Sequence, residues 1–169
     1  AAYVQGAANT SLFQAATVNV SLSKVLRSPL IFKAIYTTGG KQGYMKDGYF
    51  EIANNSDEVQ YLDGLILSAP AGKQKSKNAW QANGFEDLYA SGQGQVLAFP
   101  GSGHDYPLQP GQSVLIANDA ANHKDLAGDG NKCPDLSKAD WEVYLKYANG
   151  EVDYPAKNLD VIFVNNKNM

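Results

Sequence analysis

Short apolar segments separated by turn residues run through the whole chain. Residues 17–25 alternate strictly, with Val18, Val20 and Leu22 on one side and polar residues on the other, which is the period-two pattern of a half-buried strand. The same reasoning predicts further strands at 30–36, 49–53, 59–67, 94–99, 113–117, 141–147 and 161–164. Because no segment carries a convincing amphipathic helical period, an all-β fold is predicted, specifically an antiparallel sandwich.

Turn-forming residues mark the ends of these segments. Asn54-Asn55-Ser56-Asp57 follows the strand at 49–53, and such side chains bond their own backbone and tolerate turns. Gly64 inside the segment 59–67 predicts a bulge or bend in that strand. Pro110-Gly111 precedes the strand at 113–117 and fits a type II turn.

Two polar stretches interrupt the strand pattern. Residues 70–93 are predicted as a long loop with anchored aromatic residues. Residues 118–140 form a second polar insertion, with room for one turn of helix. The predicted fold is therefore a sandwich with two long loop insertions.

Composition and charge narrow the classes of function. The 169 residues suffice for one domain with its own core, and 44% of them are hydrophobic while 18% are charged. The net charge of −3 argues against a nucleic-acid partner. No apolar run is long enough to cross a membrane. The single cysteine, Cys133, excludes an internal disulfide and is predicted to be a small packing residue, with any further role left open.

Several of these segments together resemble the lamin-tail domain, an immunoglobulin-like sandwich. The segments are the apolar strand at 30–36, the Phe50–Ser56 strand with its turn, the strand at 59–65 that ends in Leu-Asp-Gly-Leu, and the Pro-Gly-Gln-Ser turn at 110–113. The strings at 54–65, 100–103 and 135–142 are similar more closely to an uncharacterised family of predicted lipoproteins from Gram-negative gut anaerobes.

The resemblance implies a lamin-tail-like domain over residues 30–169. It implies that residues 1–29 are an N-terminal extension, a linker or a strand of a preceding unit. It further implies an exported protein at the cell surface or in the periplasm, held to the membrane only through a lipid anchor outside this chain. The family has no established activity, so no catalytic residue carries over.

One segment, Gly101-Ser102-Gly103-His104-Asp105, contains the three residue types of a catalytic Ser-His-Asp triad. Residues this close on one loop seldom form a triad, because the base must face the nucleophile across space. The segment is predicted to be a turn, and the protein is predicted not to be an enzyme.

Calcium is the metal that the second insertion suits best. Asp125, Asp129 and Asn131 offer the oxygen ligands that calcium prefers. Ala127 and Leu136 occupy positions where a calcium loop of the EF-hand type needs ligands, so that motif is absent. The prediction is no cofactor, with a calcium-stabilised structural domain as an alternative. His104 and His123 are expected at the surface.

Aromatic residues in the loops of the sandwich are the candidates for ligand binding. Trp80, Phe85, Tyr89 and Tyr106 could serve as platforms for sugar rings, or could instead pin long loops to the sandwich. The expected function is a non-catalytic adhesion or ligand-binding module whose partner is a protein or glycan at the cell surface. The alternative is a carbohydrate-binding domain of a surface glycan-acquisition system. The sequence leaves the ligand and the oligomeric state open.

Overall fold

The fold is built almost entirely from β-strands, as predicted. The computed structural model describes residues 3–8, 17–25, 28–37, 39–70, 76–77, 79–85, 91–146 and 148–164. The strands are β1 (Tyr3–Gln5), β2 (Ser23–Val25), β3 (Leu30–Tyr36), β4 (Tyr49–Asn54), β5 (Gln60–Tyr61), β6 (Ile66–Pro70), β7 (Ser91–Ala98), β8 (Pro107–Leu108), β9 (Ser113–Ala117), β10 (Trp141–Glu142), β11 (Lys157–Asn158) and β12 (Asp160–Val164). Two one-turn helices accompany them, α1 (Ala79–Ala82) and α2 (His123–Leu126). No helix in these described ranges is long and apolar enough to cross a membrane.

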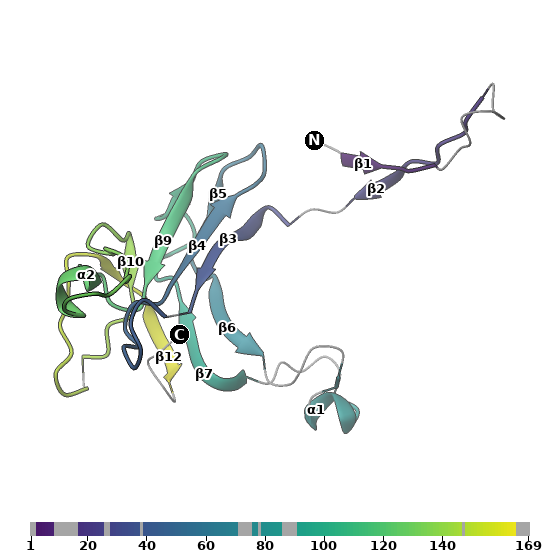
Figure 1. Ribbon diagram of the computed structural model, residues 1–169. Helices are drawn as coiled ribbons and strands as arrows, with labels where there is room; N and C mark the ends of the chain where they lie inside the picture. Colours follow the sequence, from purple (N-terminus) through teal and green to yellow (C-terminus); the bar gives the residue numbers. More distant parts are fainter. Residues whose placement is uncertain are drawn as a thin grey trace.

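Two sheets share one hydrophobic core (Figure 1). The larger sheet has the strand order β11-β10-β9-β4-β3, and the smaller has the order β12-β7-β6. Ile52 and Ile116 of the larger sheet and Leu67 and Leu97 of the smaller one belong to the same buried cluster. Since each sheet supplies alternate residues to this cluster, the period-two pattern of the sequence is explained by burial of one face of each sheet.

The prediction of a purely antiparallel arrangement was wrong at β10. This strand pairs in parallel with both β9 and β11, with Trp141 opposite Ile116 and Lys157. A parallel neighbour requires a long crossover connection, and residues 118–140 between β9 and β10 provide it. The predicted strand at 141–147 is also shortened to two residues, although Trp141 and Val143 are both buried as its alternation indicated.

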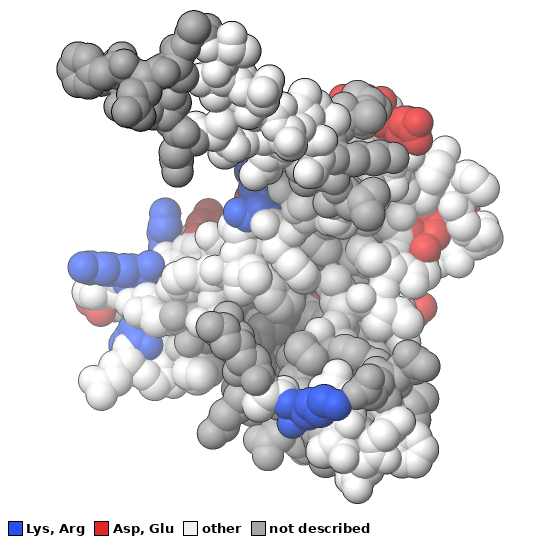
Figure 2. Space-filling view, turned by 90° about the vertical axis from the view of Figure 1, so that its right-hand side faces the viewer, with Lys and Arg blue, Asp and Glu red and all other residues white. Residues whose placement is uncertain are grey.

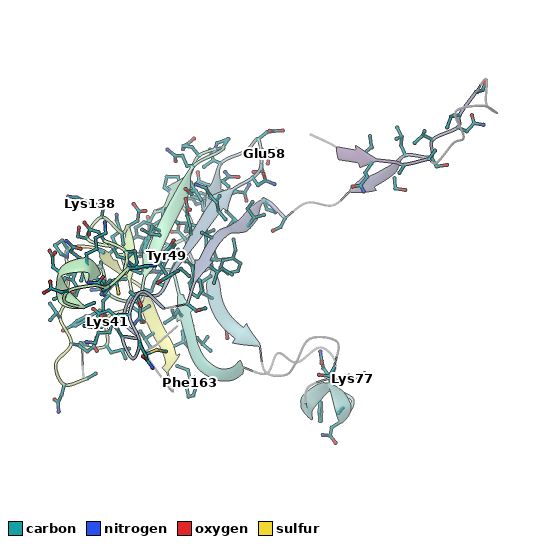
Figure 3. The ribbon with its side chains drawn as sticks, viewed as in Figure 1. Lys41, Tyr49, Glu58, Lys77, Lys138 and Phe163 are labelled. Atoms are coloured by element: carbon teal, nitrogen blue, oxygen red, sulfur yellow. The ribbon has the colours of Figure 1, made fainter. Side chains whose placement is uncertain are left out.

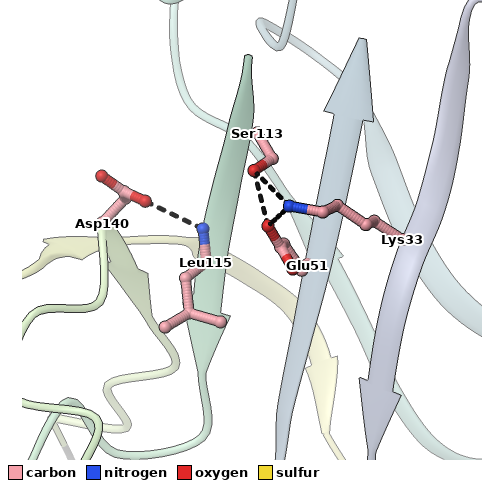
Figure 4. A network of polar contacts seen from close by, with 5 residues as sticks. All are labelled: Lys33, Glu51, Ser113, Leu115 and Asp140. Atoms are coloured by element: carbon pink, nitrogen blue, oxygen red, sulfur yellow. Dashed lines mark hydrogen bonds and ion pairs between the residues drawn. The ribbon is translucent and has the colours of Figure 1, made fainter. Parts of the chain in front are cut away.

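A polar network lies across β3, β4 and β9 on the face of the large sheet away from the core (Figure 4). Glu51 Oε1 accepts hydrogen bonds from Lys33 Nζ at 2.5 Å and from Ser113 Oγ at 2.5 Å. These hydrogen bonds, that from Lys33 above all, hold the pKa of Glu51 below its usual value. Farther along β9, Asp140 Oδ2 accepts a hydrogen bond from the Leu115 amide at 2.8 Å. This bond fastens the end of the 118–140 crossover to β9.

The turn residues between β4 and β6, which belong to different sheets, hydrogen-bond the backbone as predicted. Asn54 Nδ2 donates to the carbonyls of Glu58 and Leu108, and its Oδ1 accepts from the Ser56 amide at 2.9 Å. Gly64 adopts φ +70° in a turn that divides the predicted strand 59–67 into β5 and β6. Gly111 has φ +77°, which a type II turn requires at that position.

Asp63, in the turn between β5 and β6, holds the 101–106 loop. Its carboxylate accepts hydrogen bonds from the amides of Gly103 at 3.0 Å, Asp105 at 2.8 Å and Tyr106 at 2.9 Å. Desolvation raises the pKa of Asp63, but these three amides outweigh it, so the pKa lies below the ordinary 3.8. Gly101 passes so close that a Cβ there would lie 2.2 Å from Asp63 Oδ1. The segment that suggested a Ser-His-Asp group is therefore a loop wrapped around one carboxylate.

Replacing Asp63 with asparagine is expected to loosen this loop, because an amide nitrogen cannot accept from a backbone N–H. Hydrogen exchange at Gly103, Asp105 and Tyr106 should become faster, while Glu58→Gln, which changes an exposed carboxylate between β4 and β5, should leave it unchanged. In the parent protein the protection should persist at pH values above 3.8 and disappear as the pH falls through the lowered pKa of the folded state. Equal exchange in the two variants would show that Asp63 does not hold the loop.

The insertion at 118–140 packs against the large sheet and is not a solvated acidic loop. The predicted single helical turn is present as α2, and a second buried cluster joins Ala117, Ala120 and Leu136. The expectation of a surface position for His123 was wrong, because its ring is fully buried. Its Nε2 lies 2.9 Å from the Asp119 carbonyl and must donate to it, so Nδ1 accepts from Tyr44 Oη at 2.7 Å.

The first strands form an arm apart from the two sheets (Figure 1). β1 pairs antiparallel with β2, and Tyr3 lies opposite Val25. The predicted strand at 17–25 is assigned only over Ser23–Val25, so the alternating residues Val18, Val20 and Leu22 lie outside it. We call residues 3–8 and 17–25 the N-terminal arm.

Candidate functional site

A cleft of about 1000 Å³ lies between β12 and the chain that follows β10. Its walls come from three places: the segment after β10, the approach to and end of β11, and β12 itself. The described residues that line it are Tyr144, Leu145, Lys146, Ala148, Asp153, Asn158, Leu159, Asp160, Val161, Ile162 and Phe163. We call this the β12 cleft.

An irregularity in β12 shapes one wall of the cleft. Val161 pairs with Leu97 and Phe163 with Val96, so Ile162 is an extra residue in the ladder with β7. A bulge of this kind redirects the side chains that follow it. Phe163 is 51% exposed. Figure 3 shows it at the end of β12.

The polar groups of the cleft are mainly hydrogen-bond acceptors and amides. Asn158 Nδ2 donates to Asp153 Oδ1 at 2.9 Å, which orients both side chains. Asp160 and Lys146 also line the cleft, so carboxylates outnumber cations among its described lining residues. This balance disfavours phosphate and other anions as ligands.

Buried Glu142 holds the segment that carries Asp153, a residue of the cleft wall. Its Oε2 accepts from the Ala120 amide at 2.9 Å and its Oε1 from the Tyr154 amide at 2.7 Å. Burial raises the pKa of Glu142, the charges of Asp153 and Asp119 add to this, and the two amide hydrogen bonds oppose it. Glu142 thus connects α2's insertion to the segment that carries Asp153, and so fixes the position of that wall.

The side chains that line the cleft include groups that can bind a ligand. None of the described residues that line it is Ser, Cys or His, so the described lining holds no nucleophile paired with an imidazole base. Two aromatic rings, carboxylates and an amide can instead contact the apolar face of a ligand and hydrogen-bond its rim.

The four aromatic residues singled out in the sequence are not gathered on one described surface. Tyr106 packs edge-on against Trp141, with ring centroids 4.8 Å apart, beside the main core. Phe85 is exposed next to α1, which Figure 1 shows away from the two sheets. Trp80 lies in α1, but its side chain is outside the described part of the chain, as is the whole of Tyr89.

The three candidate calcium ligands lie in or after α2, and Asp125 and Asn131 hydrogen-bond within the insertion. Asp125 Oδ2 accepts from Asn122 Nδ2 at 2.7 Å. Asn131 Oδ1 accepts from the Cys133 amide at 2.9 Å, and its Nδ2 donates to the carbonyls of Lys124 and Gly128. Asp129 is exposed, and the described residues contain no group of three or more His, Cys, Asp or Glu side chains placed to hold a metal ion.

Sequence reasoning missed the β12 cleft. Its residues are spread over Tyr144–Phe163, and only the course of the chain between β10 and β12 brings them together. The one local signal was the apolar pair Ile162-Phe163 at the end of the chain's last strand, which a buried strand explains equally well.

Comparison with known proteins places the cleft within a recognised family segment. The sequence model of a family described as a protein of unknown function, DUF4876, matches residues 109–169. That segment contains β9 to β12 and every described residue of the β12 cleft. The match is to a family without an assigned function.

A solved structure is similar over nearly the whole chain. The crystal structure of a DUF4876 family protein from Bacteroides thetaiotaomicron VPI-5482 is 31% identical, with a TM-score of 0.68. The alignment covers 96% of this chain and 43% of that one, so this chain spans less than half the length of that relative. A search of curated proteins found no match.

Proposed function

We propose that this chain is a non-catalytic binding module of an exported bacterial surface protein, and that the β12 cleft binds carbohydrate. The observation that carries the proposal is that one cleft holds exposed Phe163, half-buried Tyr144 and the oriented Asp153–Asn158 pair. In this proposal the two sheets form a lamin-tail-like, immunoglobulin-like sandwich that is attached to the membrane by a lipid anchor outside this chain.

Sugar chemistry fits this lining. One face of a pyranose ring presents C–H groups that pack on an aromatic ring, while its hydroxyls both donate and accept hydrogen bonds. An ionised Asp153 accepts, and Asn158 both donates and accepts, so a pair of adjacent hydroxyls is matched by the pair of side chains. The excess of carboxylates over lysine favours a neutral sugar over a sulfated or phosphorylated one.

The experiment is a screen of neutral oligosaccharides on an array, followed by calorimetric titration of the strongest binder. Phe163→Ala is expected to weaken binding more than about tenfold, equivalent to ~1.4 kcal/mol. Phe32→Ala is the matched control, because Phe32 is 55% exposed on β3 and does not line the β12 cleft.

Three results would overturn the proposal. The first is equal loss of binding in the two variants, and the second is no binding by the parent protein to any sugar on the array. The third is hydrolysis of the bound oligosaccharide on prolonged incubation, which would contradict a non-catalytic role.

A further inference from the structure

β3 and β6 are edge strands among the described strands of the molecule. β3 ends the large sheet and pairs only with β4, and β6 ends the small sheet and pairs only with β7, among the strands of the described chain. The large sheet has five strands and the small sheet three, and β3 is the outermost strand of the large one. Natural proteins usually protect such edges, since free strand backbones pair with other chains.

Side chains that belong to the core side of β3 are consequently exposed. Phe32 lies opposite Ile52 and Ile35 lies opposite Phe50, so both share the face that packs on the core. Yet Phe32 is 55% and Ile35 58% exposed. A groove of about 240 Å³ runs between the two edges, lined by Ser28, Leu30, Ile31, Phe32, Ile52, Leu65, Ile66, Leu67 and Ser68. We call it the β3–β6 groove.

The N-terminal arm carries a strand pattern that suits this groove. Val18, Val20 and Leu22 alternate with Asn19, Ser21 and Ser23, and Leu22 is 65% exposed. A two-stranded hairpin is at best marginally stable alone in water, so the arm gains stability by docking. Residues 17–23 carry no charge, and neither do the described residues that line the groove, so no ion is desolvated when they meet.

The N-terminal arm points away from the groove of its own chain. Ser28 lines one end of the groove, and the arm leaves the sheets from that end and points away from them (Figure 1). Figure 2 looks onto this side of the molecule, where most of the described surface is uncharged. This direction allows the arm of one copy to reach the groove of another.

We infer that the chain self-associates by strand addition. Residues 17–22 of one copy pair with β6 of a second copy, on the edge opposite β7, and lay Val18, Val20 and Leu22 over Phe32 and Ile35. Main-chain hydrogen bonds supply the pairing, and the alternating apolar side chains fix the register. Reciprocal exchange gives a dimer, and exchange in one direction gives a chain of copies. This association does not depend on the β12 cleft.

Cysteine pairing between two differently tagged copies of the full chain tests the inference. One copy carries Leu22→Cys and the other carries Phe32→Cys, and the native Cys133 is buried. Mild oxidation of the mixture is expected to give a disulfide-linked heterodimer. Ser21→Cys mixed with Phe32→Cys is the control, because Ser21 lies on the other side of the arm's alternation, and it should give far less.

Sedimentation of the same chain provides a second readout. The parent protein is expected to form oligomers whose mass rises with concentration, Leu22→Lys should be monomeric, and Ser21→Lys should associate like the parent. A parent protein that stays monomeric at every concentration overturns the inference. So does a Leu22→Cys, Phe32→Cys double variant that closes its disulfide within one chain while the mixture of single variants forms none.

Discussion

Replacing Trp141 with alanine is expected to lower the free energy of unfolding by about 3–5 kcal/mol, the range for removing a large aromatic side chain from a core. Trp141 is only 2% exposed and lies at the centre of the main core. Its ring meets Phe99 at 4.9 Å and Tyr106 at 4.8 Å between centroids, both edge-on. Because its strand β10 pairs with both β9 and β11, the same change weakens one half of the large sheet.

Urea denaturation followed by circular dichroism would measure this effect as a lower midpoint with an unchanged slope. Trp141→Phe should cost less, since it retains an aromatic ring at the same site. Phe163→Ala also removes an aromatic ring, but one that is half exposed in the β12 cleft, and it should cost less than about 1 kcal/mol. Similar losses for Trp141→Ala and Phe163→Ala would refute the central position of Trp141.

Replacing Glu142 with glutamine is expected to destabilise the fold by about 1–3 kcal/mol, although it preserves shape and removes a buried charge. Both carboxylate oxygens accept from backbone amides, those of Ala120 and Tyr154. Glutamine has one acceptor oxygen, so its NH₂ group must face one of these donors. Glu142→Ala leaves both amides without their acceptor and should cost more. Urea denaturation at pH 7 gives both values.

The pH dependence of the free energy of unfolding separates the effect of the Glu142 charge from the effect of its side-chain shape. Burial raises the pKa of Glu142 above the ordinary 4.5, so the folded state holds its proton more tightly than the unfolded state. The resulting stabilisation is complete below pH 4.5 and is lost as the pH rises through the pKa of the folded protein. Glu142→Gln should lack that part of the profile, whereas the exposed Glu58→Gln should keep it. Identical profiles for the two variants would contradict this assignment.

Local sequence signals predicted the strands and turns well where neighbours along the chain decide the structure. Asn54 and Pro110-Gly111 form turns through their own chemistry, and the apolar alternation of 49–53 matches β4. The parallel pairing of β10 was not predictable in this way, because it depends on a crossover of more than twenty residues. Only part of the predicted strand 17–25 is paired, and the sequence could not show this either. An alternating pattern does not specify whether a partner strand is present.

The candidate site depended even more on tertiary structure. Asp125 and Asn131 look like cation ligands in the sequence, but in the structure their side chains hydrogen-bond within their own loop. Burial of His123 depends on Tyr44, which lies 79 positions away. The β12 cleft likewise exists only because the chain after β10 passes beside β12.

Because Cys133 is tightly packed, the rate at which its thiol reacts measures local opening of the fold. The residue is almost completely buried, and Gly40 lies so close that a Cβ there would be 2.5 Å from the Cys133 backbone. Burial and the neighbouring Asp47 carboxylate raise the pKa of the thiol, which further suppresses the reactive thiolate. An alkylating reagent can therefore modify the native protein only during transient separation of the 39–44 segment from the α2 insertion. The rate of that modification reports how often the two segments part, without any introduced label.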